Sequence, residues 1–576
     1  MILHTSGSVD VGPDLENIYF LGPWCTADGN RPFETSLDIS NETDLDIVEF
    51  SNLLVRELES VLYPAVNQFH NIHLHEDVWR YSLGTYLRVL APLVVTRYNL
   101  VRRAVFQRGC DRYTNLEIKK ESVTPNDRTQ LQALVNSHLW NQFVFEEICA
   151  TIGLKPTEGT RINEVEQVGH NVHLTSSMSI SGRFRRFVQK LFNSVAKRTR
   201  IVITQTMLPF PLDLNVALSC FSVPFFWQGD ASYSAKIDGD AREQLLAQVE
   251  TSDEFQMMFR KIVIRTLPKL FVEDFSRIRS RTKSLLPRSP KVVFTSNLHM
   301  ASDQFLLWLS EMRLSNTQII IGQHGGVHCL ARDLPVEASI EFALADRYLA
   351  WGEFATQLQN GVKSPVLATA QKTMRRSRDR NSVVVILDSP YRYPSMPRGF
   401  NGNRYDYASV LNHLLSSRFL SYAEHVVLRF YAGAERFDGP LHELINSHPR
   451  VVFDNGHQPL EELLERAKLV ISTSIGTSIF KSIRHDIPTM LILDPRYSCL
   501  SQWAEDHLTE LRSASILFSL PEDLVNHFVN ISTQLDEWWT SPETLQAKQV
   551  FRDLFFSNVA PTAKFYKDQI RLAAKL

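Results

Sequence analysis

The chain has few cysteines, and their arrangement points to neither a disulfide framework nor a zinc site. Six cysteines are spread singly over 576 residues, without a CxxC pair and without a cysteine and histidine cluster at zinc spacing. Disulfide-stapled secreted domains and zinc modules are therefore excluded as classes. Single scattered thiols are typical of a reducing compartment, so we expect a cytoplasmic protein.

Long apolar runs and an excess of basic charge are also missing. The longest apolar run, "VLAPLVV" at 89–95, is far shorter than the roughly 18 residues of a membrane span. The N-terminus lacks the basic and apolar regions of a signal peptide. The formal net charge is -2, whereas a nucleic-acid-binding domain is strongly basic. We expect neither a membrane span nor a nucleic-acid partner.

The composition is that of an ordinary globular protein, with 44% hydrophobic and 22% charged residues. A chain of this length exceeds what one hydrophobic core supports, so two or more domains are expected. Glycine is scarce, with 23 in the whole chain. A pair of adjacent glycines directly after an apolar run, as in "IIIGQHGGVHCL" at 319–330, is therefore a notable feature.

From residue 383 onward, short β-branched runs alternate with helical stretches, which is typical of βαβ units and a parallel sheet. Strands are predicted at 383–389, 425–431, 451–455, 469–474 and 489–494, with a sixth candidate at 515–518. This half is expected to form an open Rossmann-type sheet.

The first two-thirds of the chain is less regular but carries the signals of a second α/β domain. It contains a predicted strand at 17–24, a helix from about Asp44, and further helix through about residue 150. Three strand-like runs follow at 200–206, 291–297 and 318–323. The predicted fold class is α/β, with two Rossmann-like domains that face a cleft and helical insertions in the first.

The domain boundaries follow from a polar, basic segment without apolar periodicity, residues 369–382, which is predicted to be the linker. Residues 1–368 then form the first domain and 383–535 the second. Residues 536–576 are expected to be helices that pack back on the first domain.

A run of hydroxyl residues follows the predicted strand 469–474. Ligands of open α/β sheets bind outside the carboxyl ends of the strands, where helix N-termini offer unpaired N–H groups. Hydroxyls and amides at that place can cradle a phosphate without a lysine. The alternative is a capped helix, since Ser and Thr are common caps. The predicted donor-phosphate residues here are Ser472, Thr473, Ser474, Gly476, Thr477 and Ser478.

Two charged residues are placed at the same predicted cleft. Arg429 ends the strand 425–431 and can present a bidentate cation to a phosphate or a carboxylate, although a salt bridge explains it equally well. Asp388 lies in the loop after the first strand of this half. Both are predicted to line the donor site.

In "IIIGQHGG", a predicted strand delivers Gln323 and His324 at its carboxyl end. The glycines, Gly325 and Gly326, allow a close approach of the backbone or a positive φ. Histidine at this place can donate to a phosphate or act as a general acid or base, whereas a lone histidine is more often structural. Together with the hydroxyls near 472, the stretch is predicted to be one side of a donor-phosphate clamp.

A catalytic base for an acceptor hydroxyl is expected among the carboxylates of the first domain. Asp303 is the first candidate, although its place in the first turn of a predicted helix is also explained by pairing with the helix dipole. Asp28 and Glu34, in the loop after the first predicted strand, are the rivals.

The stretch "RFRRFVQKLFNSVAKRTR" at 183–200 has seven basic and no acidic residues, and its apolar residues fall on one helical face. This pattern is typical of a helix that lies on an anionic membrane surface. The alternative is a solvated basic face whose apolar stripe packs in the core. We therefore expect peripheral contact with the inner face of the cytoplasmic membrane as one of two interpretations.

The hydroxyl segment resembles the nucleotide-sugar half of GT-B glycosyltransferases, in which a strand, a Gly-Thr-Ser-like turn and a helix bind the donor. The turn 476–478 and Pro488 fit that pattern. Lys481 stands where the ribose-binding Glu is usual, and Asp486 stands where a Gly is usual. The resemblance therefore supports a phosphate contact and leaves the ribose contact without its usual residue.

Across most of the chain, six short motifs resemble a bacterial family of surface-carbohydrate transferases. They are "YFLGPWC", "WRYSLGTYLRVL", "TSNLHMASDQF", "GQHGGVHC", "YLAWGE" and "STSIGTS", in this order. The resemblance implies a GT-B enzyme similar to those that use CMP-activated acidic sugars such as Kdo or nonulosonic acids. In such enzymes a histidine and a Ser/Thr pair hold the donor phosphate, which matches His324 and 472–474 by type. Pro23 departs from the more polar residue expected in "LGxWC".

The predicted activity is metal-independent transfer of a sugar, with no cofactor, from a nucleotide donor to a glycan or lipid-linked acceptor. The second half would hold the donor, and the first the acceptor. No DxD-like metal-binding pair stands at a predicted strand end, and hydroxyls, amides and cations can stabilise the leaving phosphate. A CDP-polyol phosphotransferase, a nucleotide-sugar epimerase and an inactive scaffold of glycan assembly are the alternatives.

Overall fold

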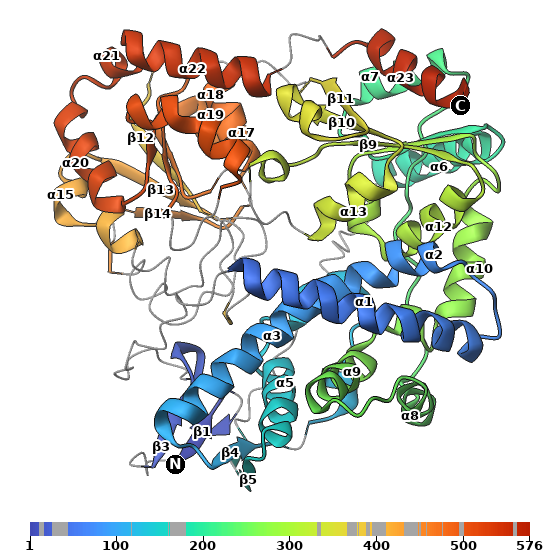
Figure 1. The fold of residues 1–576 in the computed structure, drawn as a ribbon. Helices are drawn as coiled ribbons and strands as arrows, with labels where there is room; N and C mark the ends of the chain where they lie inside the picture. Colours follow the sequence, from blue (N-terminus) through green and yellow to red (C-terminus); the bar gives the residue numbers. More distant parts are fainter. Residues whose placement is uncertain are drawn as a thin grey trace.

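The computed structural model (Figure 1) is built on parallel sheets covered by helices. It describes residues 1–7, 9–10, 17–25, 44–116, 118–158, 160–161, 180–330, 336–365, 377, 379–387, 392–393, 410–430, 447–448, 451–456, 458–474, 476–494, 500–556 and 561–575. Among them, no helix combines the length and the apolar character needed to cross a bilayer.

A small parallel sheet near the N-terminus has the strand order β3-β1-β4-β5. Its strands are β1 (Ile2–His4), β3 (Ile18–Phe20), β4 (Arg112–Asn115) and β5 (Lys155–Glu158). Of these strands the sequence predicts only β3; the helix expected through about residue 150 is present as α3 (Leu83–Arg108) and α5 (His138–Thr151), and the short strand β4 interrupts it. These strands have three or four residues each, and β4 reads "RYTN", so no apolar alternation marks them.

Long helices separate this sheet from the rest of the chain. They are α1 (Asp44–Phe69), α2 (Glu76–Tyr81), α3 (Leu83–Arg108) and α5 (His138–Thr151). Helix α3 is buried along much of its length between α1 and α5, because its apolar residues recur on more than one face. These helices are the predicted insertions, and they carry the largest hydrophobic cluster of the described residues.

A five-stranded parallel sheet follows, with the order β11-β10-β9-β8-β7. Its strands are β7 (Ile201–Ile203), β8 (Val292–Thr295), β9 (Gln318–Gly322), β10 (Arg347–Trp351) and β11 (Gly361–Ser364). The strands predicted at 200–206, 291–297 and 318–323 are confirmed. Apolar residues of helices α7 (Phe210–Ser219) and α23 (Ala563–Lys575) cluster with β7, β8 and β9.

The third sheet has six parallel strands in the order β14-β13-β12-β15-β16-β17. They are β12 (Ser382–Ile386), β13 (His425–Arg429), β14 (Val451–Asp454), β15 (Ala467–Ser472), β16 (Thr489–Ile492) and β17 (Leu517–Phe518). Counted within this sheet, the order is 3-2-1-4-5-6, the Rossmann order. All six predicted strands are confirmed, and the order reverses between β12 and β15. A ligand crevice is expected at that point.

The second and third sheets share one hydrophobic cluster. It joins Ile321 and Trp351 at the ends of β9 and β10 to Phe480 of helix α18 (Thr477–Arg484). The Trp351 and Phe480 rings lie 5.1 Å apart, centroid to centroid. Helix α22 (Pro542–Phe555) completes this cluster. The predicted α/β fold class with Rossmann-like sheets is therefore confirmed, and packed side chains join the two sheets beside their strand ends.

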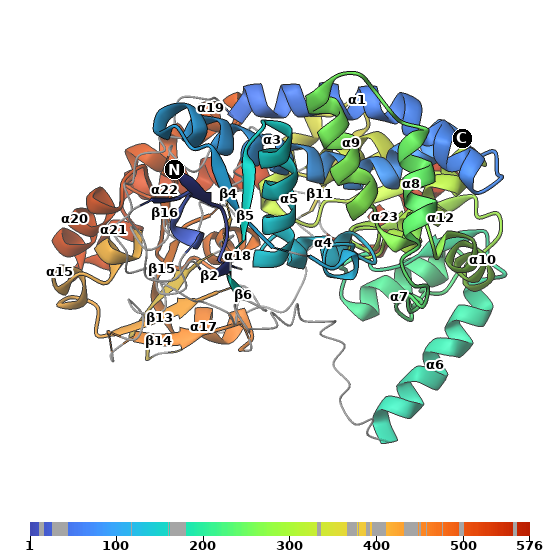
Figure 2. The same cartoon turned by 90° about the horizontal axis from the view of Figure 1, so that it is seen from below.

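Helix α6 (Ile180–Ala196) stands apart from these layers. In Figure 2 it projects from the body of the molecule beyond α7 and α10 (Phe275–Leu285). Its C-terminal residue Ala196 is buried, while the side chains described in its middle are mostly exposed.

Candidate functional site

The strand β9 ends in a loop that Gln323 holds in place. The Gln323 side chain is fully buried; its amide nitrogen donates to the Gly325 carbonyl at 2.8 Å, and its amide oxygen accepts from the Trp351 N–H at 2.8 Å. The indole of Trp351 in turn donates to the Gln323 carbonyl at 3.0 Å. Both polar atoms of the side-chain amide therefore form hydrogen bonds with backbone groups of the protein. The prediction that Gln323 contacts the donor phosphate is not supported.

The two glycines of the loop have different roles. A Cβ placed on Gly326 would lie 2.3 Å from a ring carbon of Phe480, which a real side chain cannot occupy. On Gly325 it would make only an ordinary contact, 3.7 Å from His328. Neither glycine is among those with positive φ. The expected close approach at Gly326 is therefore present, but the neighbour is an aromatic ring of α18.

Three histidines surround one buried carboxylate beside this loop. Glu341, on helix α13 (Val336–Leu344), has no exposed surface. Its Oε1 accepts from His299 Nε2 at 2.9 Å, and its Oε2 accepts from the Tyr348 hydroxyl at 3.2 Å. Nδ1 of His324 lies 3.5 Å from Oε1, and Nδ1 of His328 lies 3.5 Å from Oε2. We call these residues the histidine cluster.

Burial sets the protonation of the histidine cluster. It lowers the pKa of His299 to about 3, helped by the nearby charge of Arg128, and the pKa of His328 to about 4. Burial also lowers the pKa of His324, while the Glu341 carboxylate opposes that shift. The His324 side chain is 20% exposed, against 1% for His299 and 8% for His328. His324 is therefore the member of the cluster best able to meet a ligand.

Glu341 was missed by the sequence analysis. Its only local signal is an acidic residue within the apolar stretch "VEASIEFAL" of α13. A carboxylate behind an imidazole orients the ring and stabilises its protonated form, which is what a histidine acting on a phosphate or as an acid or base requires. The structure thus places the Glu341 carboxylate 3.5 Å from His324 Nδ1, which is the kind of partner that either role requires.

The same residues contain the one group of metal-ligand types that the described part of the chain brings together. Ligand atoms of His324, His328 and Glu341 all lie within 4.8 Å of one another. Both carboxylate oxygens, however, already accept hydrogen bonds from His299 and Tyr348. The cluster is therefore held together by hydrogen bonds between its own side chains and Tyr348.

The hydroxyl segment forms the opposite side of the site. Strand β15 ends at Ser472, which is buried and donates from Oγ to the Ser474 carbonyl at 2.8 Å. Thr473 is bound to the end of β12, its N–H donating to the Ile386 carbonyl at 3.1 Å. These three hydroxyl residues, 472–474, therefore build the turn at the sheet's switch point.

The next residues open helix α18 and are less buried. Gly476 is its N-cap, without a side-chain cap hydrogen bond, and Thr477 and Ser478 form the first turn with no acidic residue. The first N–H groups of a helix lack intrahelical partners and favour an anion. The predicted phosphate contact is therefore best located at 476–478, while Ser472, Thr473 and Ser474 support the turn.

The two sides meet through α18. The short helix η5 (Gly326–Cys329), which follows His324, contacts α18, and Gly326 lies against Phe480. Phe480 belongs to the same helix whose N-terminus carries Thr477 and Ser478. One short helix therefore links the histidine loop to the phosphate-type turn, two segments about 150 positions apart in the sequence.

Several predicted site residues have other partners. Arg429 forms an ion pair with Asp454 on the adjacent strand β14 and also donates to the Gln458 carbonyl, so the salt-bridge alternative holds. Lys481 pairs with Glu461 at 2.5 Å. Asp28, Glu34 and Asp388 lie outside the described residues.

The base predicted at Asp303 is not supported. This carboxylate is 7% exposed; it lies 3.3 Å from the Arg128 guanidinium and accepts the Arg128 N–H at 2.6 Å. Arg128 also donates to the Met300 carbonyl at 2.8 Å. Asp303 therefore neutralises a buried arginine and fastens helix α4 (Arg128–Leu134) to α12 (Asp303–Leu314).

Asp486, which stands where the resemblance expects glycine, has a φ of 54°. This is the left-handed region that glycine adopts easily and that Asp tolerates better than most residues. Its carboxylate accepts from Lys548 Nζ at 2.9 Å and from the Trp539 indole at 3.1 Å. The backbone requirement of the pattern is thus kept, and the side chain holds α22.

The search of curated proteins gave no match. Among solved structures, TarM matches with 11% identity and a TM-score of 0.33 over 52% of this chain and 57% of TarM. Anabaena HepE in complex with UDP and glucose matches with 11% identity and a TM-score of 0.35, over 66% of this chain and all of that one. The wall teichoic acid polymerase TagF matches with 11% identity and a TM-score of 0.29, over 51% of this chain and 84% of TagF.

The family comparison covers nearly the whole chain. A sequence model described as the LIC12162 family transferase matches residues 2–570. The chain therefore belongs to the LIC12162 family of transferases.

Proposed function

We propose that this transferase moves a sugar from a nucleotide donor to a bacterial surface glycan, with the donor phosphate held between His324 and the N-terminus of α18. One observation carries the proposal. Gly326 packs on Phe480, so the loop of a carboxylate-backed histidine is fastened to the helix whose free N–H groups and hydroxyls suit a phosphate. Both elements follow strand ends, where ligands of parallel sheets bind.

In this proposal, the His324 ring donates a hydrogen bond to the phosphate on one side. On its other side, Glu341 stabilises the protonated form of the ring. Burial favours the neutral ring, but an entering phosphate brings a second negative charge next to it. A proton shared between Glu341, His324 and phosphate then stabilises the charge that develops as the glycosidic bond breaks. The acceptor hydroxyl needs a separate base, because His324 is engaged by the donor phosphate.

The variant His324→Ala tests this assignment. We expect it to weaken binding of the nucleotide donor as well as the rate of transfer. The matched control is His485→Ala, a half-buried histidine at the other end of α18. Isothermal titration with the nucleotide separates the two roles of His324. A lower rate with unchanged nucleotide affinity would make it the base and overturn the clamp.

For the donor, we propose a CMP-activated acidic sugar. The support is the resemblance of the chain's motifs to transferases that use such donors, together with the hydroxyl, amide and imidazole groups at the candidate site, which suit a phosphate. A thermal-shift panel of CMP, CDP, UDP, GDP and ADP tests it, since a ligand of the native state raises the melting temperature. A response to UDP alone would refute the CMP donor. A phosphodiester product would indicate a polyol phosphotransferase instead.

The proposal includes docking on an anionic membrane through α6. The side chains of Phe187, Leu191 and Val195 are 59%, 52% and 51% exposed, so this apolar stripe does not pack in the core. The other side of the helix is anchored by Asn193, whose side-chain amide bonds the Phe226 backbone at 2.7 and 2.8 Å. An exposed apolar stripe flanked by basic residues suits a bilayer with anionic lipids.

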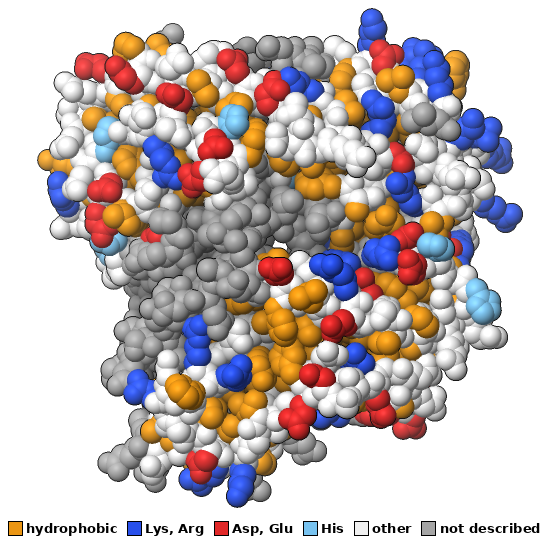
Figure 3. Space-filling view, viewed as in Figure 1, with side chains coloured by type: hydrophobic (Ala, Val, Ile, Leu, Met, Phe, Trp, Pro, Cys, Tyr) orange, Lys and Arg blue, Asp and Glu red, His pale blue; other side chains and the backbone are white. Residues whose placement is uncertain are grey.

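The neighbouring helices extend this surface. Phe210, at the start of α7, is 52% exposed and lies beside Phe226. Phe221, just after α7, is 90% exposed and has a φ of 55°, which is unusual for a bulky residue. Lys567 and Arg571 of α23 lie near this turn. Figure 3 shows Lys and Arg side chains gathered at the edge where Figure 1 places α6 and α23.

Sedimentation with vesicles tests the membrane contact. We expect the protein to bind vesicles that contain phosphatidylglycerol, and to be released by high salt. The double variant Phe187→Ser/Leu191→Ser should abolish binding, because each apolar side chain contributes about 1.5–3 kcal/mol when buried. Phe106→Ser, at a 91% exposed phenylalanine on α3, is the control. Equal binding of all three proteins would refute the assignment to α6.

A further inference from the structure

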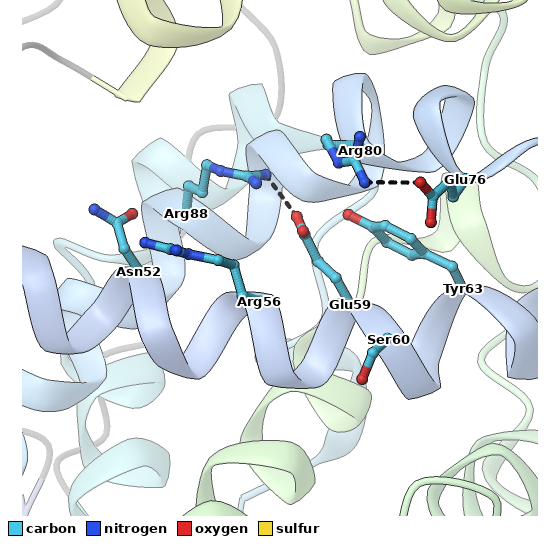
Figure 4. A pocket seen from close by; sticks show the side chains of 8 residues that line it. All are labelled: Asn52, Arg56, Glu59, Ser60, Tyr63, Glu76, Arg80 and Arg88. Carbon is cyan, nitrogen blue, oxygen red and sulfur yellow. Dashed lines mark hydrogen bonds and ion pairs between the residues drawn. The ribbon is translucent and has the colours of Figure 1, made fainter.

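A polar cavity lies between α1, α2 and α3, outside the candidate site. Its volume is about 440 Å³, within the range of small-molecule sites. Most ligand pockets are lined chiefly by apolar side chains, whereas here every lining residue carries a hydrogen-bonding side-chain group. The lining residues are Asn52, Arg56, Glu59, Ser60, Tyr63, Glu76, Arg80 and Arg88. Figure 4 shows them on facing turns of the three helices.

The inner wall of the cavity is an ordered charge cluster. Arg88 Nη1 lies 2.7 Å from Glu59 Oε1, and the two side chains are 18% and 9% exposed. Tyr63 lies beside them, and burial together with the Glu59 charge raises the pKa of its hydroxyl. Groups this well buried are fixed before any ligand arrives, so little ordering is lost on binding.

Gly84 makes this wall possible. A Cβ on Gly84 would lie 2.5 Å from Arg88 Nη1, 2.7 Å from the Tyr63 hydroxyl and 2.9 Å from Glu59 Oε1. Its φ is not positive, so the glycine is required by space and not by backbone conformation. Gly84 lies within the motif "WRYSLGTYLRVL", which also supplies Arg80 and Arg88. The candidate transfer site uses none of these residues.

The rim of the cavity is accessible. Arg80 is 42% exposed and pairs with Glu76 at 3.1 Å. Arg56 is exposed and has no ion-pair partner among the described residues. Arg80 also pairs with Asp77 at 2.5 Å, and Arg88 pairs with Glu59, so Arg56 is the lining arginine whose charge is not neutralised by an ion pair among the described residues. Asn52 adds an amide donor and acceptor to the lining.

The cavity is close to the histidine cluster. Tyr81, next to Arg80, donates from its hydroxyl to the Ala343 carbonyl at 3.4 Å, and Ala343 lies two residues after Glu341 on α13. Helices α3 and α13 are also in contact. Two of the helices that line the cavity, α2 and α3, therefore also contact α13, the helix that carries Glu341.

We infer that this cavity binds a sugar residue that carries a single negative charge, as a recognition subsite for the acceptor glycan. A carbohydrate offers hydroxyls on nearly every carbon, which fits a pocket lined by both hydrogen-bond donors and acceptors. The unpaired Arg56 guanidinium suits one carboxylate or phosphate. The acceptor role rests on the proposed function, whereas the sugar-binding chemistry rests on the cavity alone.

Ligand-observed saturation-transfer NMR on the full-length protein tests the inference, with glucuronate and glucose as probes. We expect glucuronate, which carries one negative charge, to bind more tightly than glucose. Arg56→Gln should weaken glucuronate binding about tenfold, the effect of losing one charge-assisted hydrogen bond. Arg102→Gln is the control, an exposed arginine on α3 that lines a different hollow.

The outcomes separate this inference from the proposed function, because nucleotide binding is measured on the same protein. If nucleotides bind but no sugar signal responds to Arg56→Gln, the inference is overturned and the proposed function stands. If glucuronate binding depends on Arg56 while no nucleotide binds, the cavity is a sugar site and the proposed function fails. Equal losses in Arg56→Gln and Arg102→Gln would also overturn the inference, since the effect would not be local.

Discussion

Replacing Glu341 by Gln probes the part of the site that the proposal depends on most. The substitution keeps the shape of the side chain but removes the charge. Glu341 is fully buried, with His299 at 2.9 Å and His324 at 3.5 Å from the same carboxylate oxygen. The variant should therefore deprive His324 of the anion that favours its protonated form.

The size of the effect follows from the distance. Opposite unit charges about 4 Å apart attract by about 4 kcal/mol at an effective dielectric constant of about 20. Relaxation and the amide dipole of Gln recover part of this energy, so we expect a loss of about 2.7 kcal/mol, a hundredfold fall in kcat/KM. The pKa of His324, which Glu341 raises, should also fall. Nucleotide affinity should then decline at a lower pH in Glu341→Gln than in the native protein.

The assay is transfer to an acceptor glycan across pH 5 to 9, with nucleotide binding measured over the same range. Glu311→Gln is the matched control, because Glu311 is 10% exposed and paired with Arg279 and Lys283 on the far side of α12. It should lose stability and keep kcat/KM. If Glu341→Gln folds and its kcat/KM stays within threefold of the native value, the carboxylate does not support His324 and the reasoning is wrong.

Three further predictions concern the packing around the site. Gly326→Ala should lower both activity and melting temperature, because overpacking against Phe480 costs about 1–3 kcal/mol, and Phe480→Leu in the same chain should restore part of both. Burial lowers the pKa of His299 to about 3, so below pH 6.5 the unfolded chain binds a proton at this histidine and the folded chain does not. The stabilising contribution of neutral His299 is complete above pH 6.5 and falls by about 1.4 kcal/mol per pH unit below it. The free energy of unfolding of His299→Gln, measured with urea, should therefore decrease less steeply with falling pH than that of the native protein. An unchanged dependence on pH would contradict the burial argument. Asp486→Asn removes the anion of the buried Lys548 ammonium; because the Asp486 side chain is 57% exposed, the free energy of unfolding should fall by about 1 kcal/mol, checked by thermal and urea unfolding, and no measurable loss would mean that Lys548 is not held by this charge.

Much of the fold could be predicted from local patterns. The apolar runs that became β7, β8, β9 and β12 to β17 are flanked by polar turns, and a buried parallel strand leaves this signature regardless of its neighbours. The strands β1, β4 and β5 could not be predicted in this way. β1 has only three residues, β4 and β5 are mainly polar, and pairing between neighbouring strands makes them strands, so the signal exists only in the folded sheet.

The site was predictable in part. The sequence analysis identified His324 and the turn at 476–478, because both follow strand ends and consist of residue types suited to phosphate. It assigned ligand roles to Gln323 and Arg429 and a catalytic role to Asp303. All three engage protein partners that come from distant segments: Trp351, Asp454 and Arg128. A polar side chain at a strand end meets either a ligand or another part of the protein, and residue type alone does not decide between them.

By itself, the sequence determined that this is an α/β protein with a Rossmann-type second half and with a histidine at the end of a strand, because periodicity and residue chemistry act locally. Tertiary structure alone decided three contacts. Glu341 lies 3.5 Å from His324, Gly326 leaves room for the Phe480 ring, and Gly84 leaves room for the charged side chains of the cavity. These features join residues up to about 150 positions apart. Such contacts arise from the packing of whole elements, and no local pattern records them.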